Sequence, residues 1–118
     1  MTMEQIAQRA QGLLSSPVNR GLQEQWLQDL ELQVWQEVFC ACADAPAKPE
    51  PAWDAPMLIE APYTDVYVYH ILRQEALLVG DMEQYNQYLL LFSSRYREFA
   101  AWYLRNHRVL SVSGNTPW

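Results

Sequence analysis

Cysteine and histidine are the side chains of this sequence that metal binding or nucleophilic chemistry would use. Cys40 and Cys42 are its two cysteines, and His70 and His107 are its two histidines. In a helix, side chains two residues apart point about 200° away from each other, so the two thiols do not chelate one ion together. A structural zinc site takes four ligands, and both histidines lie far from the cysteines in sequence. We expect no metal and no cofactor, and we interpret each cysteine as a small apolar residue near a helix end.

The carboxylates near His70 do not complete a catalytic group. Asp65, His70 and Glu75 fall within one predicted helix, where a rotation of about 100° per residue places them on different faces. The sequence contains no Gly-rich phosphate loop, no nucleophile elbow and no Ser–His–Asp pattern in a recognisable context. We therefore interpret His70 as a half-buried structural residue and expect that the chain is not an enzyme.

Composition and charge narrow the class of protein. With 118 residues the chain fits one domain, residues 1–118, with one hydrophobic core. Half of its residues are hydrophobic and 19% are charged, which argues against disorder of the whole chain. The formal charge of −6 opposes binding of DNA or an anionic membrane over the whole surface. Residues 1–4 lack the basic and then apolar order of a signal peptide, and the apolar run 89–92 is too short to span a bilayer. Two cysteines are too few for a disulfide framework. We therefore expect synthesis in a cytosol.

Helical patterns fill the first third of the chain. Thr2 with Gln5 predicts a capping box that opens a helix over residues 3–14. A second helical pattern over residues 22–38 places Trp35 and Phe39 on the side opposite its core-facing stripe. Because such a helix has two apolar faces, one of them is available for a partner. The core-facing stripe consists of Leu22, Trp26, Leu27, Leu30, Val34 and Val38.

A proline-rich connection follows over residues 44–62, which hold five of the seven prolines. Regular helix cannot continue through them. Residues 57–59 form either a short edge strand or part of a surface linker, with Trp53 folded back onto the core.

Two further helices form an antiparallel hairpin. Thr64 predicts the start of the first, and Gly80 followed by Asp81 predicts its end and the start of the second. We predict an extended tail over residues 109–118. The expected fold is therefore all-α, a small bundle of about four helices. The last helix presents one aromatic stripe to the core, made of Tyr85, Tyr88, Leu89, Phe92, Tyr96, Phe99 and Tyr103.

A second stripe on the last helix, from Leu91 to Trp102, combines apolar and charged side chains as a contact surface does. It is either an outer face with one half-buried tryptophan or, as we expect, a subunit interface, because aromatic and arginine side chains favour interfaces. Residues 95–108 also hold four arginines against one glutamate, a local charge of +3 that leaves −9 for the rest. These cations either complement the helix dipole or meet an acidic partner. The candidate interface residues are Leu91, Arg95, Glu98 and Trp102, together with Trp35 and Phe39.

Four stretches match a known pattern in order and spacing. They are Trp26-Leu27-Gln28-Asp29-Leu30-Glu31 running on to Val34-Trp35-Gln36-Glu37-Val38, Ala61-Pro62-Tyr63-Thr64-Asp65-Val66-Tyr67-Val68-Tyr69, Gly80-Asp81-Met82-Glu83-Gln84-Tyr85-Asn86, and Phe99-Ala100-Ala101-Trp102-Tyr103-Leu104-Arg105-Asn106-His107. Over most of residues 22–108 the chain resembles a family of small phage and prophage proteins that are encoded among virion structural genes. These proteins are similar to head–tail connector (adaptor) proteins.

The resemblance implies a structural protein of the virion neck, made in the host cytoplasm. Similar adaptors form a ring, usually of twelve copies, between the portal protein and a tail or stopper protein, and DNA passes through without sequence-specific binding. In them a C-terminal extension grips the portal, and by position residues 109–118 would do so here. The usual proline soon after the final histidine is absent, since Arg108 and Val109 follow His107. The portal contacts implied by position are Arg105, Arg108, Val109, Val112 and Trp118.

Two other interpretations stay open. A small acidic prophage-encoded protein that binds and inhibits a host protein would also carry a charge of −6. A tetratricopeptide-like hairpin would place a turn such as Gly80-Asp81 between aromatic-rich helices, but one unit is present, whereas solenoids need about three.

Overall fold

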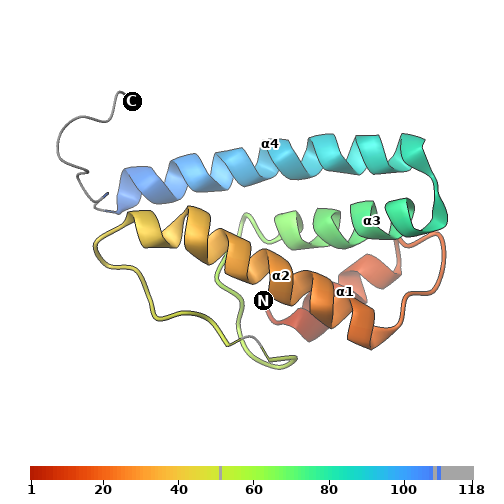
Figure 1. Cartoon of the computed structure of the whole chain (residues 1–118), viewed down its shortest axis with the longest axis horizontal. Coiled ribbons are helices and arrows are strands. Elements are labelled where there is room, and N and C mark those ends of the chain that lie inside the picture. The colour runs from red at the N-terminus through yellow and green to blue at the C-terminus, as the bar shows by residue number, and fades with distance from the viewer. Residues whose placement is uncertain (51, 108, 110–118) are drawn as a thin grey trace.

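Four α-helices and one short 3-10 turn make up the computed structural model, which describes residues 1–50, 52–107 and 109. Figure 1 shows α3 and α4 lying side by side in opposite directions, with α1 and α2 packed against α3. The predicted all-α fold with a C-terminal helical hairpin is confirmed. The elements are α1 (Met3–Gln11), α2 (Arg20–Glu37), η1 (Phe39–Ala41), α3 (Asp65–Val79) and α4 (Met82–Asn106).

Local capping sets most of the helix ends. The Thr2 hydroxyl accepts a hydrogen bond from the Gln5 backbone N–H, and the Gln5 side chain accepts one from the Thr2 N–H, so the predicted capping box is confirmed. At the other hairpin end, Gly80 has φ 78°, a left-handed conformation that glycine adopts without steric cost. Asp81 then caps α4 by accepting from the Gln84 N–H at 3.1 Å. The first helix ends at Gln11, three residues earlier than expected.

Thr64 does not cap α3 in the way the sequence predicts. Its backbone is already in the right-handed helical region, with φ −64° and ψ −18°, and its side chain makes no capping hydrogen bond. A tight turn leads into the helix instead, since Val66 N–H donates to the Tyr63 carbonyl and Tyr67 N–H to the Thr64 carbonyl, each at 3.1 Å. Thr64 is buried, so it serves the core at this point.

The core forms where α3 meets the other helices. Leu27, Leu30, Val34 and Val38 of the predicted stripe are buried, whereas Leu22 and Trp26 are half-buried. In α4, the aromatic stripe buries Phe92, Phe99 and Tyr103. These side chains close on a continuous cluster from α3, made of Val66, Tyr67, Val68, Ile71 and Leu72.

The proline-rich connection packs against the core as an irregular segment. Met57 and Ile59 are buried and Trp53 is half-buried, so the connection closes one side of the core. Within the described residues it forms only an isolated bridge, between Thr2 and Pro56, and the alternative of an edge strand over 57–59 is wrong. The alternating burial of Met57 and Ile59 explains why these residues resemble a strand in sequence.

A buried polar cluster fastens this connection to α2 and α3. One carboxylate oxygen of Glu31 accepts from the Tyr67 hydroxyl at 2.6 Å, and the other accepts from the Leu58 N–H at 2.8 Å. The Tyr67 oxygen in turn accepts from the Ile59 N–H at 2.8 Å. Burial raises the pKa of Glu31, although both hydrogen bonds act in the opposite direction. We call these residues the Glu31–Tyr67 latch.

Candidate interaction surfaces

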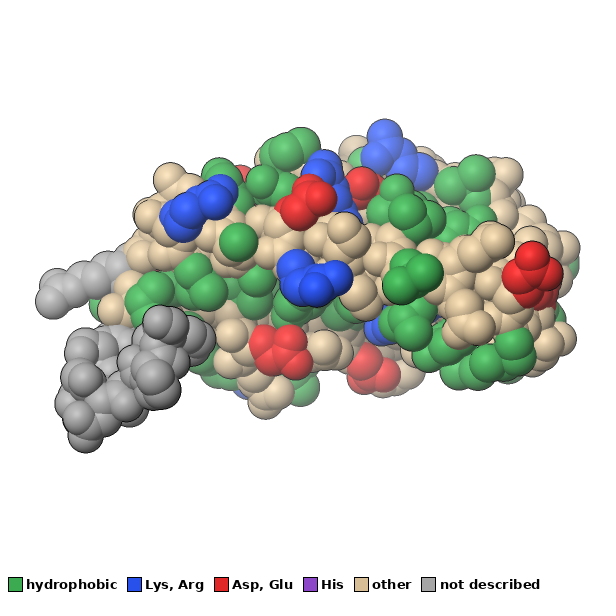
Figure 2. Space-filling view, turned by 90° about the horizontal axis from the view of Figure 1, so that it is seen from above, with side chains coloured by type: hydrophobic (Ala, Val, Ile, Leu, Met, Phe, Trp, Pro, Cys, Tyr) green, Lys and Arg blue, Asp and Glu red, His purple; other side chains and the backbone are tan. Residues whose placement is uncertain are grey.

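The turn between α3 and α4 exposes consecutive apolar side chains. Leu77, Leu78, Val79 and Met82 are 49% to 62% exposed, because the last turn of α3 extends beyond the core before Gly80 reverses the chain. Two acidic residues, Asp81 and Glu83, lie in the same turn and in the first turn of α4. We call these six residues the hairpin tip. Figure 2, which looks down on α4, shows hydrophobic side chains gathered toward this end of the molecule and an acidic side chain beside them. Apolar patches of this kind mark interaction sites.

The predicted contact stripe lies on the flank of α4 that adjoins the start of α3. Leu91 is 46% exposed and Trp102 is 37% exposed. The Trp102 ring packs on Tyr63, with 5.6 Å between ring centroids, so one side of the indole is covered and the other is open. Both interpretations of this stripe therefore agree with its geometry, since a half-buried tryptophan still offers apolar surface.

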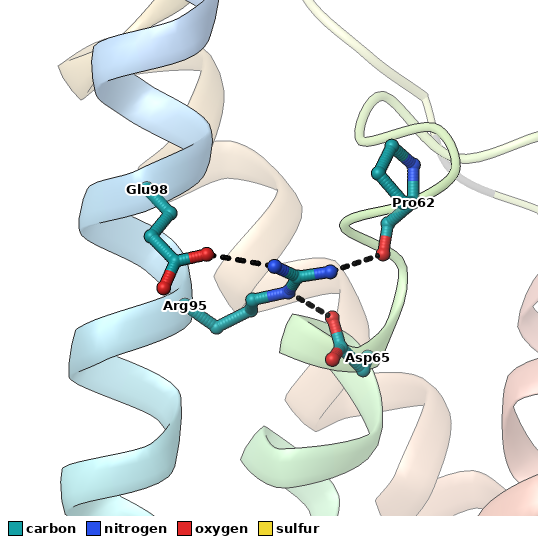
Figure 3. A network of polar contacts seen from close by, with 4 residues as sticks. All are labelled: Pro62, Asp65, Arg95 and Glu98. Carbon is teal, nitrogen blue, oxygen red and sulfur yellow. Dashed lines mark hydrogen bonds and ion pairs between the residues drawn. The ribbon is translucent and has the colours of Figure 1, made fainter.

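Arg95 is partly exposed and is held by contacts within the chain, as Figure 3 shows. Its guanidinium donates to the Asp65 carboxylate at 3.0 Å, the Glu98 carboxylate at 2.7 Å and the Pro62 carbonyl at 2.8 Å. Hydrogen bonds to the two carboxylates raise the pKa of Arg95 above its ordinary value. Arg95 thereby fastens α4 to the start of α3, and we call this arrangement the Arg95 clamp. Three of its five N–H groups donate within the chain, which gives Arg95 a structural role, and its place at a subunit interface stays a prediction.

Arg97 and Arg105 are the residues of α4 that carry its excess of positive charge. Both side chains are exposed, and within the residues that the structure describes neither forms an ion pair with a carboxylate. The Arg97 guanidinium donates only to the Ser93 carbonyl one turn away. In Figure 2, basic side chains lie over the middle of α4 and toward the end opposite the hairpin tip. We call Arg97, Ala101, Trp102 and Arg105 the basic end of α4.

Phe39 is misplaced by the sequence interpretation. It is 5% exposed and packs in the core against Phe99 and Tyr103, with its ring centroid 4.4 Å from that of Tyr103. The reason is that α2 ends at Glu37 and the chain turns into η1, which rotates Phe39 inward from the face it would occupy on a continuing helix. Phe39 is therefore a core residue.

Trp35 stays half-buried, but the proline-rich connection covers part of it. Its indole N–H donates to the Pro46 carbonyl at 2.9 Å. The second apolar face of α2 is consequently closed in part by the chain itself, so much of the surplus aromatic surface on this helix is used within the molecule.

The predicted tail and its contacts lie mostly outside the described residues. Arg108, Val112 and Trp118 fall there, as does most of the predicted extended segment 109–118. Val109 is described: it is 43% exposed and forms an isolated bridge with Cys42. Next to it, His107 stacks on Tyr103 and contacts the Asp44 carboxylate at 2.8 Å, and this bond lowers the pKa of Asp44.

The titratable groups in the core have structural partners. His70 is buried, its Nε2 donates to the Trp26 carbonyl, and its Nδ1 accepts from Arg73. Burial, and secondarily the charge of Arg73, lowers the pKa of His70 to about 4, so the ring is neutral at pH 7. Glu75, also buried, accepts from the Ser15 N–H and hydroxyl and from the Ser16 N–H, which holds the loop after α1 against α3. Asp65, His70 and Glu75 thus make separate contacts, as their spacing predicts.

Sequence reasoning missed two buried carboxylates, Glu31 and Glu75. A signal for Glu31 exists, because it occupies the position between Leu30 and Val34 on the buried stripe of α2. A carboxylate on an apolar stripe predicts a buried hydrogen-bonding partner. Glu75 offers a similar signal, because it follows buried Ile71 by four residues and buried Leu72 by three on the same face of α3.

One cleft of about 590 Å³ lies between α1, the loop after it and Trp53. Arg20 stacks over the Trp53 ring at 4.1 Å on its rim, and Gln8, Gln11 and Gln23 line its walls. Glu4, Ser15 and Ser16 also line the cleft, and Glu4 is the single carboxylate among the lining residues, so the lining holds no pair of carboxylates.

The described part of the chain, residues 1–50, 52–107 and 109, contains no candidate metal site and no candidate membrane span. No cluster of three or more histidine, cysteine or acidic side chains there could hold a metal ion, and no helix there is long and apolar enough to cross a membrane. No family model, curated protein or solved structure matches the chain. The described surface therefore defines a small all-α protein whose exposed apolar side chains gather at the hairpin tip and along one flank of α4.

Proposed function

We propose that this chain is a bacteriophage head–tail connector (adaptor), a structural protein that forms a ring between the portal protein and a tail or stopper protein. The observation that carries the proposal is the amount of apolar surface left uncovered on one chain. The large hydrophobic side chains of the hairpin tip, together with Trp102 on α4, are 37% to 62% exposed. A chain that works alone has little reason to expose them, whereas a ring subunit buries them against its neighbours.

The resemblance of residues 22–108 to phage and prophage adaptors supports the same role. In a ring around a DNA channel, the acidic surface of a chain with net charge −6 would repel the phosphates and let packaged DNA slide past. Residues 109–118 are the proposed contact with the portal. This role requires no cofactor and no enzymatic activity.

Molar mass in solution tests the proposal. Multi-angle light scattering during gel filtration should give the mass of a multi-subunit ring, either for the purified chain alone or after mixing with the portal protein of the same genome. A chain without residues 109–118 should remain folded and no longer co-elute with the portal. A monomer that does not bind the portal would refute the connector role.

The alternative is a small acidic protein that binds and inhibits a host protein. The net charge of −6 favours it, because an acidic surface can occupy the DNA-binding surface of a basic partner. Such a protein should stay a monomer or dimer in the same experiment and should recover a specific host protein in a pull-down.

A further inference from the structure

The hairpin tip and the basic end of α4 complement each other in both charge and polarity. The tip combines four exposed apolar side chains with the carboxylates of Asp81 and Glu83. The basic end combines the exposed side of Trp102 and the small side chain of Ala101 with the guanidinium groups of Arg97 and Arg105. Glu98 also lies beside Trp102, but Arg95 pairs with it. Each surface therefore has an apolar centre beside charges of one sign that lack such a pair among the described residues, and the two signs are opposite.

These two surfaces cannot meet within one chain. Ala101 follows Met82 by 19 residues on the same helix, a separation of about 28 Å at 1.5 Å per residue. The domain is elongated, measuring 48 by 31 by 21 Å, and Figure 1 places the α3–α4 turn and the C-terminal end of α4 at opposite ends of its long axis. Complementary surfaces at opposite ends of a rigid helix can be joined only between two molecules.

We infer that the hairpin tip of one copy docks on the basic end of α4 of the next copy, head to tail. The inference deepens the connector proposal and rests on it for the choice of a second copy as partner. A head-to-tail contact uses two different surfaces, so it leaves one of each kind free and adds further copies, which close into a ring where the rotation between copies allows it and otherwise form a filament. The contact also places Asp81 and Glu83 opposite Arg97 and Arg105, which sets its direction.

A side-by-side antiparallel pairing of two α4 helices would satisfy the same charges but not the apolar surface. Leu77, Leu78 and Val79 belong to α3, which lies beneath α4 in Figure 1, so a pair formed over the outer face of α4 would leave them in water. That pair would instead bury Leu90, which is 71% exposed midway between the two surfaces. Leu78 and Leu90 therefore distinguish the two arrangements.

Cysteine cross-linking tests the direction of the contact. Val79→Cys and Ala101→Cys introduced into one chain should give, under mild oxidation with copper phenanthroline, a ladder of covalent dimers, trimers and larger species. Each single variant should give no ladder, and the unchanged protein controls for Cys40 and Cys42. Covalent dimers alone, or no cross-linked species, from the double variant would exclude a continuing head-to-tail contact, and cross-linking of either single variant would indicate like-to-like contact. Either result would overturn the inference.

Point substitutions give a second, independent readout. Leu78→Asp should weaken self-association by at least about tenfold, whereas Leu90→Asp, the same change at a more exposed leucine, should leave it unchanged. Ala101→Glu should also prevent assembly, and mixing it with the Leu78→Asp protein should give a one-to-one dimer, because each variant keeps one intact surface. Circular dichroism should report unchanged helix content in all three.

The results separate this inference from the connector role. Assembly that survives Leu78→Asp, or cross-linking of the Val79→Cys tip to the portal instead of to a second copy, would refute the head-to-tail contact and leave the connector role standing. A cross-linked ladder from a chain that does not bind the portal would support the head-to-tail contact and refute the connector role.

Discussion

Replacing Tyr67 with phenylalanine removes one oxygen atom from the Glu31–Tyr67 latch while keeping the aromatic ring in the core. The hydroxyl donates to Glu31 and accepts from the Ile59 N–H, and Tyr67 is fully buried. Tyr67→Phe therefore leaves a carboxylate oxygen and a backbone N–H without partners and out of reach of water. Each unsatisfied buried group costs about 1–3 kcal/mol. Glu31 keeps its bond to the Leu58 N–H, so we expect a total loss of about 2–4 kcal/mol.

This loss is a large part of the stability of a small domain, which is about 5–15 kcal/mol in total. Urea unfolding followed by circular dichroism at 222 nm measures it directly. At roughly 4 °C per kcal/mol for a domain of this size, the thermal midpoint should fall by roughly 8–16 °C. The slope of the urea transition should not change, because the native and unfolded surfaces stay the same.

Tyr96→Phe is the matched control. Its hydroxyl donates to the Glu37 carboxylate at 2.8 Å, but at the surface, where water replaces the lost partner. We expect that variant to lose less than about 1 kcal/mol. Equal losses for the two variants would refute the claim that burial makes the latch important, and so would a Tyr67→Phe protein as stable as the unchanged chain.

Three further changes test other parts of the structure. Because the pKa of His70 is about 4 in the folded protein and near 6.5 when unfolded, stability should be complete above pH 6.5 and fall by up to about 3 kcal/mol as the pH drops to 4. Urea titrations at several pH values should show this slope, and His70→Gln should flatten it; an unchanged slope would contradict the assignment. Arg95→Ala should lower the thermal midpoint more than Glu98→Gln does, since the first removes all three bonds of the Arg95 clamp and the second weakens one exposed bond; scanning calorimetry ranks them, and the reverse order would show that the clamp is not structural. Gly80→Ala should lower the free energy of unfolding by about 1 kcal/mol. The loss comes from the left-handed backbone alone, because an added Cβ would meet no atom within 4 Å. Gly80→Asn should lose less, and urea unfolding measures both variants.

Sequence alone determined the helices, the N-terminal caps of α1 and α4, and the hairpin. The Thr2–Gln5 capping box and the Gly80-Asp81 turn involve residues at most three positions apart, so the information for them is local. The aromatic stripe of α4 follows in the same way from helical periodicity, which states which face is apolar before any partner is known.

Only the tertiary structure decided which partners the charged residues contact and whether residues at helix ends, such as Phe39, are buried. Arg95 meets Asp65 across 30 residues, and Glu31 meets Tyr67 across 36, so neither pair has a local signature. Phe39 looked like a surface residue because periodicity assumes a continuing helix, and the break after Glu37 turned it inward. Charged side chains are long and find partners on whichever element packs beside them, so their roles depend on the packing of the helices. The same packing leaves the hairpin tip uncovered and covers Phe39, which is why the exposed surface could be located only in the folded chain.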